Sequence, residues 1–447
     1  MQTMEEAAEA LAAGLASAEA LTDEALARIA ADALPGTFTA VHADAARAQA
    51  RALDALRAAG APPGRYAGIP VTVKDLFDEA GHTTRAGSVV LRDAPPATAD
   101  APTVARLRRA GFVVLGRTGM TEFAFSGLGV NPHHGTPPSP WDRATGRLPG
   151  GSSSGAAVAA AEGMGFGGLG TDTGGSCRVP AALCGITGFK PTARRVPLAG
   201  ALPLSQSLDS IGPLARTVAC CAVLDAVISG DEAPVPPAPR PVGQLRLALP
   251  RGTFLMEDMD ATVAAAFNRA LARLSAAGAR IELLDLPELV ELPAVNATGG
   301  FAASEAWAWH RRLIAERREG YDPRILARIQ RGERMTAAEY IDLVNARARI
   351  IAAVARRTAG FDALVCPTVP VIPPAIAEVE PEAEYNRINM LLLRNTAVGN
   401  FLDRCSISLP IHRPGEAPVG LMLTGEAVAD RALLAAAAGI EAALAER

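Results

Sequence analysis

Cysteine is scarce in this chain, which limits the kinds of protein it can be. Only six cysteines occur in 447 residues, and their spacing is irregular. A disulfide framework needs a higher density, and a structural zinc site needs closely paired ligands. We therefore expect reduced, mostly buried thiols, and we expect neither a metal nor a cofactor. The six positions are Cys177, Cys184, Cys220, Cys221, Cys366 and Cys405.

A strong charge excess and a long apolar run are also missing. The 43 lysines and arginines against 47 aspartates and glutamates give a net charge of -4, so we expect no basic surface for nucleic acid. The chain has no apolar run of about 18 residues, the length a membrane helix needs. Residues 1–7 lack the positive start and apolar stretch of a signal peptide. We expect a cytoplasmic protein that binds neither nucleic acid nor a membrane.

Short apolar runs alternate with helical patterns along the chain, which is typical of an α/β protein. One segment differs, because residues 233–242 hold five prolines in ten positions and can form neither a helix nor a central strand. On this pattern alone the segment separates two halves. Residues 4–31 are expected to be helical, with Thr22 as the N-cap of a second helix. Further helices are expected at 101–110, 155–163, 258–277 and 302–357, and strands at 68–74, 112–115, 245–249, 280–284, 363–366 and 406–409.

Residues 163–176 contain seven glycines in fourteen positions. Such a density lets backbone N–H groups face a ligand without obstruction by side chains, as in an oxyanion hole or an anion cradle. A phosphate loop would end in Gly-Lys-Ser or Gly-Lys-Thr, which this segment does not. Tight turns without a functional role remain the alternative explanation of the glycines.

Ser176 follows two of these glycines, so its hydroxyl is placed beside backbone donors that suit an oxyanion. A competing nucleophile lies at residues 151–155, whose Gly-Ser-Ser-Ser-Gly matches the nucleophile elbow of α/β-hydrolases, with His412 as the best available histidine. That elbow needs a preceding strand, whereas residues 139–149 are polar and rich in turn formers. Cys177 would stay protonated for lack of a basic partner, which disfavours a cysteine hydrolase.

Lys74 is the candidate general base. It ends the apolar segment 68–74, and burial there would have to lower its pKa by roughly two or three units to give a free amine at neutral pH. The alternative is a solvated surface lysine. His133 and His134 are adjacent in a proline-rich loop rather than four apart on a helix, so they indicate loop residues or a contact at the rim of a substrate site, not a metal pair.

Together these segments resemble the amidase signature family. The resemblance is carried by residues 149–192, which include Pro149-Gly-Gly-Ser-Ser-Ser-Gly155 and Gly170-Thr-Asp-Thr-Gly-Gly-Ser-Cys-Arg178, and it extends over roughly residues 65–440. Further matching segments are 68–75, 116–123, 366–370 and 418–422. The family fold implies an α/β protein with one mixed β-sheet flanked by helices on both faces. It implies a single domain over 1–447, with a catalytic core at about 65–225, a surface loop at 233–242, and 243–447 completing the sheet and pocket.

The resemblance also implies the site. Ser176 matches the family nucleophile, Ser152 the bridging serine whose flanking peptide is typically cis, and Lys74 the base. Neutral Lys74 would draw a proton from Ser152 as Ser152 draws one from Ser176. Oxyanion donors are expected from the backbone of Thr173, Gly174, Gly175 and Ser176. Supporting residues are expected at Asp172, Arg178 and Ser153, and pocket walls at Phe123, Phe125, Gly127, Leu128 and Cys177.

The implied activity is hydrolysis of a small or aryl amide through a Ser176 acyl-enzyme, with reach to carbamate, urea-like or ester bonds. The alternative is the ammonia-releasing subunit of a tRNA-dependent amidotransferase, which takes its ammonia from glutamine; the chain is short for that role. The chain departs from the family at Ser154, Cys177 and 403–405, near the expected acyl pocket, so the substrate stays open. A small-molecule amide is the expected partner, and a homodimer is the default assembly.

Overall fold

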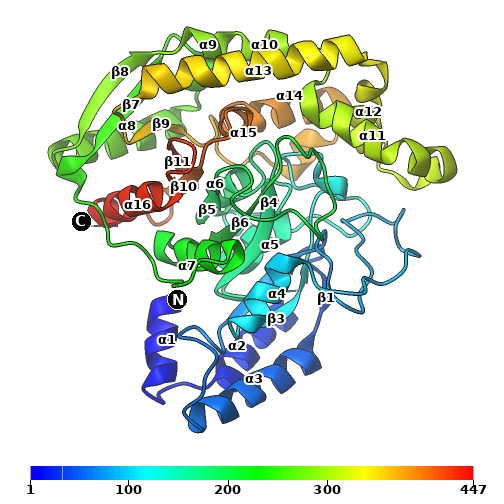
Figure 1. Ribbon diagram of the computed structural model, residues 1–447, viewed down its shortest axis with the longest axis vertical. Helices are drawn as coiled ribbons and strands as arrows, with labels where there is room; N and C mark the ends of the chain where they lie inside the picture. Colours follow the sequence, from blue (N-terminus) through cyan, green and yellow to red (C-terminus); the bar gives the residue numbers. More distant parts are fainter. Residues whose placement is uncertain (1, 33, 446–447) are drawn as a thin grey trace.

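The computed structural model describes residues 2–32 and 34–445, and one mixed sheet forms its centre (Figure 1). In the described chain this sheet has 11 strands in the order β1-β3-β2-β4-β6-β5-β10-β11-β9-β7-β8. The strands are β1 (Phe38–Val41), β2 (Pro70–Lys74), β3 (Val113–Thr118), β4 (Gly167–Asp172), β5 (Thr187–Lys190), β6 (Ser210–Ala215), β7 (Arg246–Arg251), β8 (Arg280–Asp285), β9 (Ala363–Pro367), β10 (Ser406–Pro410) and β11 (Gly420–Thr424).

The sheet combines two parallel groups with an antiparallel middle. Strands β3, β2 and β4 run parallel, as do β9, β7 and β8, while the strands between them pair antiparallel. The expectation of one mixed sheet is therefore confirmed. The proline-rich residues 233–241 contain neither helix nor strand, yet β5 from before them pairs with β10 from after them. Both halves of the sequence thus share one sheet.

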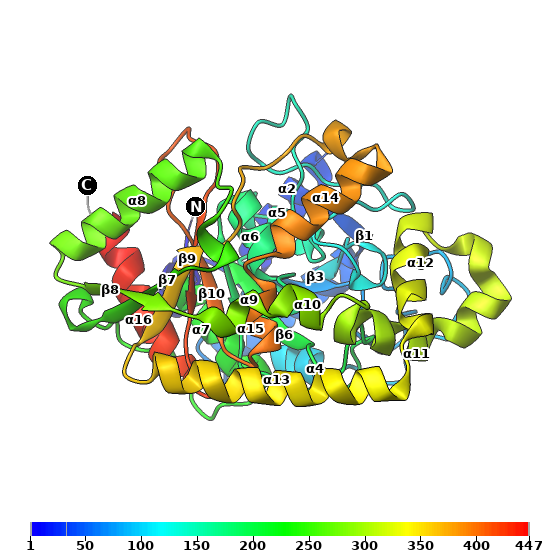
Figure 2. The same ribbon diagram turned by 90° about the horizontal axis from the view of Figure 1, so that it is seen from above.

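Helices cover both faces of the sheet, because its strands bury alternate residues in different cores. On β9, Val365 packs into a core with α16 and α8, whereas Leu364 packs into a core with α13. Figure 2 accordingly shows α8 and α13 on opposite sides of β7 and β9. No helix in the described residues is long and apolar enough to cross a membrane.

The α-helices are α1 (Met4–Ala12), α2 (Ala18–Ala31), α3 (Ala43–Ala58), α4 (Pro102–Arg109), α5 (Ser154–Ala161), α6 (Arg178–Cys184), α7 (Val218–Ser229), α8 (Ala261–Ala276), α9 (Pro287–Val290), α10 (Leu292–Val295), α11 (Gly300–Arg317), α12 (Pro323–Gln330), α13 (Ala337–Thr358), α14 (Glu382–Leu393), α15 (Ala397–Phe401) and α16 (Asp430–Ala445). Short 3-10 turns are η1 (Glu122–Ala124), η2 (Val242–Gln244), η3 (Phe254–Met256), η4 (Arg318–Gly320), η5 (Arg331–Arg334) and η6 (Ile376–Val379). Every helix and strand expected from the sequence has a counterpart here.

Two local predictions were wrong. Thr22 lies buried inside α2, and the N-cap is Ser17, whose hydroxyl accepts the N–H of Ala20 at 3.0 Å. The glycine-dense stretch is not one loop, because residues 167–172 form the central strand β4. Only the five residues 173–177 form a turn between β4 and α6.

The glycines of β4 allow a close approach between strand and helix. A Cβ atom on Gly168 would lie 2.7 Å from the Thr72 hydroxyl and 3.1 Å from the Ala156 Cβ of α5, and one on Gly170 would lie 2.8 Å from the Ser153 hydroxyl. Helix α5 is itself almost all alanine, glycine and serine, and it is buried nearly throughout. Small residues on both partners therefore press the start of α5 against the edge of the sheet.

This packing can be tested with Gly168→Ala. Since the added methyl group meets Thr72 and a fixed alanine Cβ, we expect the free energy of unfolding to fall by about 1–3 kcal/mol. Urea unfolding measures the change. Gly64→Ala is the matched control, since its Cβ would meet only the Ala110 carbonyl oxygen at 3.5 Å. Equal stability of the two variants would contradict the tight strand–helix contact.

Candidate active site

A buried lysine lies at the carboxyl edge of the sheet, where parallel β2 and β4 end side by side. Lys74, the last residue of β2, has 0% of its surface exposed. Its Nζ donates to the hydroxyl of Ser152 at 2.8 Å and to the hydroxyl of Thr171 at 2.7 Å. The strand pairing supplies Thr171, and the segment just before α5 supplies Ser152. The lysine amine therefore contacts two hydroxyls, and no carboxylate of the described residues bonds it.

Burial decides the protonation of this amine. Loss of water lowers the pKa of Lys74 to about 7, while the more distant Cys177, Asp172 and Asp209 oppose the shift. Asp209 is itself buried, which raises the pKa of its carboxyl to about 6 despite hydrogen bonds from Thr173 and two backbone N–H groups. Near neutral pH a large share of Lys74 is thus the free amine, which can accept a proton.

The serine segment before α5 lies against the glycine turn. The Gly151–Ser152 peptide is cis. Ser153 donates its N–H to the carbonyl oxygen of Ser176 at 3.3 Å and its hydroxyl to the carbonyl oxygen of Thr171 at 3.3 Å. Ser153 therefore contacts the backbone of β4 and of the glycine turn, whereas Ser152 faces the lysine. The sequence-distant residues Lys74, Ser152 and Ser176 all converge at this edge.

The turn at residues 173–176 presents free backbone donors. No acceptor in residues 2–32 or 34–445 bonds the N–H of Thr173, Gly174, Gly175 or Ser176. Gly175 has a φ of 141° and a Cβ there would lie 2.1 Å from the hydroxyl of Thr396, so both the backbone and the space require glycine. The Thr396 hydroxyl donates to the Gly174 carbonyl oxygen at 2.6 Å and so helps to fix the turn.

A buried ion pair holds both ends of the turn. Asp172 and Arg178 are 0% exposed and form two hydrogen bonds, Nη2 to Oδ1 at 2.7 Å and Nε to Oδ2 at 3.0 Å. Burial raises the pKa of Asp172, but the Arg178 charge and hydrogen bonds outweigh it and keep the pKa below its usual value. Asn400 of α15 bonds both partners, at 2.9 and 2.7 Å. The N–H of Cys177 also donates to Asp172 at 3.0 Å.

Sequence analysis missed three of these supporting residues, namely Thr171, Thr396 and Asn400. Thr171 could have been found, because it directly precedes Asp172, which was predicted. It lies in β4, the parallel neighbour of the strand that ends in Lys74. Thr396 and Asn400 carry no local signal, because they lie more than 200 positions along the chain from the turn they bind. Only the folded chain brings α15 to the site.

A cavity of about 1070 Å³ opens beside Ser176 and is lined mainly by apolar side chains. Of the five residues expected in its wall, Phe125 lines it. Its lining also includes Ala124, Ser126, Thr173, Gly174, Leu204, Leu208, Phe254, Asp258, Met259, Asp260, Leu292, Pro293, Asn296, Gly299, Phe301, Ala302, Arg328, Val371, Arg387, Met390, Leu391, Leu393, Arg394, Ala397, Val398 and Phe401.

The other four residues expected in the wall do not line this cavity. Phe123 packs its ring against His310 and Tyr321, with ring centroids 4.4 and 5.3 Å apart. Leu128 belongs to a separate buried cluster, and Gly127 packs behind Leu393. Cys177 is fully buried, and burial raises its thiol pKa.

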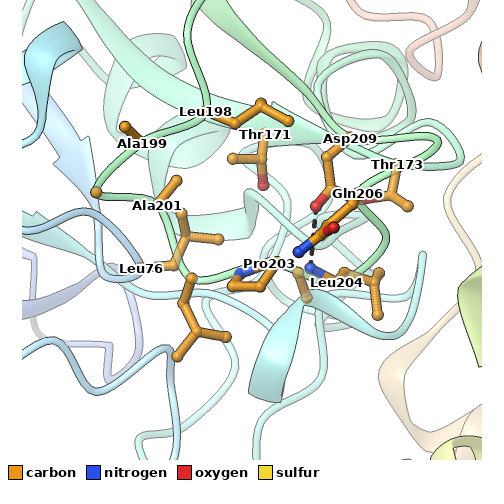
Figure 3. Close-up of a pocket in the computed structure, with 13 residues that line it drawn as sticks. Leu76, Thr171, Thr173, Leu198, Ala199, Ala201, Pro203, Leu204, Gln206 and Asp209 are labelled. Atoms are coloured by element: carbon orange, nitrogen blue, oxygen red, sulfur yellow. Dashed lines mark hydrogen bonds between the residues drawn. The ribbon is translucent and has the colours of Figure 1, made fainter. Parts of the chain in front are cut away.

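A smaller cavity of about 410 Å³ lies on the other side of Thr173 (Figure 3). Thr171 and Asp209 reach its wall, together with the loop of residues 198–204. It shares Ala124, Thr173 and Leu204 with the larger cavity. Thr171, which bonds Lys74, and the acidic residue Asp209 thus line the smaller cavity.

The competing interpretations of the sequence find no support in the geometry. In the described chain no strand leads directly into Gly151, so the strand–turn–helix elbow of an α/β-hydrolase is absent. His133 bonds the buried carboxylate of Glu122 at 2.9 Å, which raises the pKa of His133, and neither His133 nor His134 lines the large cavity. This edge of the sheet therefore offers serine hydroxyls, a lysine amine and backbone N–H groups.

Known proteins similar to this chain in sequence and fold include amidases. The family described as Amidase matches residues 20–434. A crystal structure of an amidase superposes with a TM-score of 0.88 at 32% identity, covering 99% of each chain. The 2-amino-5-chloromuconic acid deaminase of Comamonas testosteroni is 40% identical over 401 residues, 89% of this chain and 86% of that protein. A glutamyl-tRNA(Gln) amidotransferase subunit of Roseiflexus castenholzii is 35% identical over 470 residues, 97% of this chain and 94% of that protein.

The chain therefore belongs to the amidase family, and the predicted family membership is confirmed. It is a hydrolase that acts on amide C–N bonds. The length argument against an amidotransferase subunit was wrong, because the chain matches nearly the whole length of that relative.

Asp172→Asn tests the ion pair that holds the glycine turn. The substitution leaves the Arg178 charge buried without a counter-ion, so we expect the free energy of unfolding to fall by about 3–5 kcal/mol. Arg251→Gln is the control, because its pair with Asp285 is more than half exposed and screened by water, so its loss should barely change the free energy of unfolding. Urea unfolding measures the free energy lost in each variant. Similar losses of free energy would contradict a structural role of the buried pair.

Proposed function

We propose that this amidase cleaves small or aryl amides through an acyl-enzyme on Ser176, with Ser152 as proton bridge and Lys74 as base. The observation that carries the proposal is the 2.8 Å hydrogen bond between the buried Lys74 Nζ and the Ser152 hydroxyl, beside the turn that ends in Ser176. A fully buried lysine next to a serine and away from carboxylates is costly to maintain. Proton transfer through the serine gives that burial a function.

In the acylation step, the Ser176 hydroxyl oxygen bonds to the substrate carbonyl carbon. Its proton passes to Ser152 while the Ser152 proton passes to the neutral amine of Lys74. The carbonyl oxygen becomes an oxyanion, which the free N–H groups of the turn at 173–176 are placed to stabilise. Collapse of the intermediate breaks the C–N bond, and the proton returns from Lys74 through Ser152 to the leaving amine.

Deacylation repeats these steps with water in place of Ser176. Water attacks the acyl carbon, its proton moves through the same bridge, and the Ser176 oxygen leaves with a proton from Ser152. The same chemistry serves esters, carbamates and urea-like bonds, because each has a carbonyl carbon with a leaving group. These bonds are included in the proposal.

The large cavity supports a small, mainly apolar acyl group. Its walls near Ser176 carry side chains such as Leu208, Phe301 and Val398. The relative from Comamonas testosteroni is named for removing an amino group from a small chlorinated acid, which also favours a small-molecule substrate.

A second candidate is ammonia release within an amidotransferase, favoured by the relative from Roseiflexus castenholzii that matches along almost its whole length. Affinity purification from the source cells distinguishes the two. A lone chain that hydrolyses simple amides supports the first proposal, and a stable complex with a second protein and tRNA supports the second.

The proton bridge is tested by single substitutions assayed on an aryl amide. We expect Ser176→Ala, Ser152→Ala and Lys74→Ala each to lower kcat/KM by at least about 10³-fold. Ser153→Ala and Ser154→Ala are the matched controls and should lose less than about tenfold, because their hydroxyls bond backbone carbonyls and not Lys74. Intact mass spectrometry should detect an acylated wild-type chain and none in Ser176→Ala. Equal losses in the three serine variants 152 to 154 would contradict the assigned bridge.

The pH profile tests the base. Lys74 must be neutral to accept a proton, so kcat/KM should rise with pH up to about 7 and level off above it, as the pKa of Lys74 predicts. The assay uses a neutral amide, so that the substrate does not titrate. A profile that is flat through neutrality would exclude Lys74 as the titrating base.

A further inference from the structure

An arginine in the wall of the large cavity forms no ion pair with any residue that the structure describes. Arg328 of α12 lines the same cavity as Ser176. Its Nε is buried without an acceptor, and its Nη2 donates only to the side-chain oxygen of Asn386, at 3.1 Å. Burial lowers the pKa of Arg328 and the neighbouring Arg331 adds to this, while Tyr385 and Asp322 oppose it. A half-buried guanidinium with unused donors is in a costly state.

The other two arginines of the cavity are already bonded by the protein. Arg387 donates two hydrogen bonds to the carboxylate of Glu384, at 2.7 and 2.9 Å. Arg394 donates to the carbonyl oxygen of Glu257 at 2.7 Å and to Asn395 at 3.1 Å. Arg328 differs from both, because the described chain gives it no ion pair and a single neutral acceptor.

Other donors surround Arg328 without acceptors. The guanidinium lies over the ring of Tyr385, 5.5 Å from its centroid, and the hydroxyl of Ser126 lies beside the hydroxyl of this buried tyrosine. The side-chain nitrogen of buried Asn389 has no acceptor among the described residues, while its oxygen accepts from the Ser126 hydroxyl at 2.9 Å. Ser126 lines the cavity. This corner, formed by α12, α14 and the segment after η1, therefore has more donors than acceptors.

The acidic residues near this cavity either accept hydrogen bonds from backbone N–H groups or lie away from Arg328. Asp322, the N-cap of α12, accepts the N–H of Arg324 at 2.9 Å. Asp260, which also lines the cavity, caps α8 by accepting the N–H of Thr262 at 2.7 Å. Asp258 raises the pKa of Arg394 and so lies on the Arg394 side. None of these carboxylates forms an ion pair with Arg328, and Figure 2 shows α12 and α8 at opposite ends of the view.

We propose that Arg328 binds an anionic group of the substrate, so that the preferred amides carry a carboxylate on the part that the large cavity holds. A guanidinium matches a carboxylate with two parallel N–H donors, which a neutral substrate would leave unused. This inference rests on the proposed function and narrows its substrate class to amides that also carry an acid group. Apolar walls then hold the chain between the amide and the acid.

The first test measures binding without turnover. Calorimetry with Ser176→Ala compares adipamic acid, a carboxylate amide, with hexanamide, a neutral amide of the same carbon number. We expect adipamic acid to bind at least about tenfold more tightly, and Ser176→Ala with Arg328→Gln to lose that preference. Equal binding of the two amides to Ser176→Ala would overturn the anionic subsite. Because no catalysis is needed, this result is independent of whether the proposed hydrolysis is right.

The second test measures turnover of the same pair. Arg328→Gln should lower kcat/KM for adipamic acid by about 10- to 100-fold, mainly through KM, and leave hexanamide within about threefold. Arg328→Lys should restore part of the loss because it keeps the charge. Arg349→Gln is the control and should leave both substrates unchanged, since this exposed arginine pairs with Glu291 and does not line the cavity. Equal loss on both substrates would assign Arg328 a structural role and contradict the proposal.

Absence of turnover of either amide by wild type, with the binding preference intact, would count against the proposed function and leave the subsite standing.

Discussion

The site depends on one buried amine and on what surrounds it. Lys74 leaves water completely at the end of β2, and desolvation makes its neutral form available near pH 7. Two hydroxyls, those of Ser152 and Thr171, then satisfy the nitrogen without a carboxylate that would keep it charged. The glycines of β4 serve this arrangement, because only their lack of side chains lets α5 bring Ser152 so near the strand edge.

The second constraint is that both halves of the sequence form a single sheet. Pairing of β5 with β10 joins the two halves of the sequence, and α15 then reaches the glycine turn with Thr396 and Asn400. The Asp172–Arg178 pair is fully buried, so it needs the hydrogen bonds that Asn400 adds to both partners. The free N–H groups at 173–176 are held in place by contacts from more than 200 residues away.

The large cavity also combines segments from both halves of the sequence. Its walls come from α10, α11, α12, α14 and α15, all in the second half, and from the turn and η1 in the first half. Substrate choice is thus separated from the groups at the sheet edge, since the apolar wall and Arg328 lie on helices that do not carry Lys74 or Ser152. Variation in those helices can change the substrate without disturbing the buried lysine.

The sequence alone predicted the strands with apolar runs, such as β2 and β9, and through its resemblance to the amidase signature family it implied the mixed sheet and a site at Lys74, Ser152 and Ser176, because local composition and short motifs carry that information. It failed for β4, since a strand made of glycines has no apolar alternation, and for Thr22, since burial rather than capping fixes that residue. Of the five residues predicted in the pocket wall, only Phe125 lines the large cavity of the described chain, because the others pack against neighbours distant in sequence. Only the tertiary structure decided the burial of Lys74, the contacts of Asn400 and the unpaired state of Arg328. Each depends on neighbours distant in sequence, and desolvation is a property of the whole packed environment.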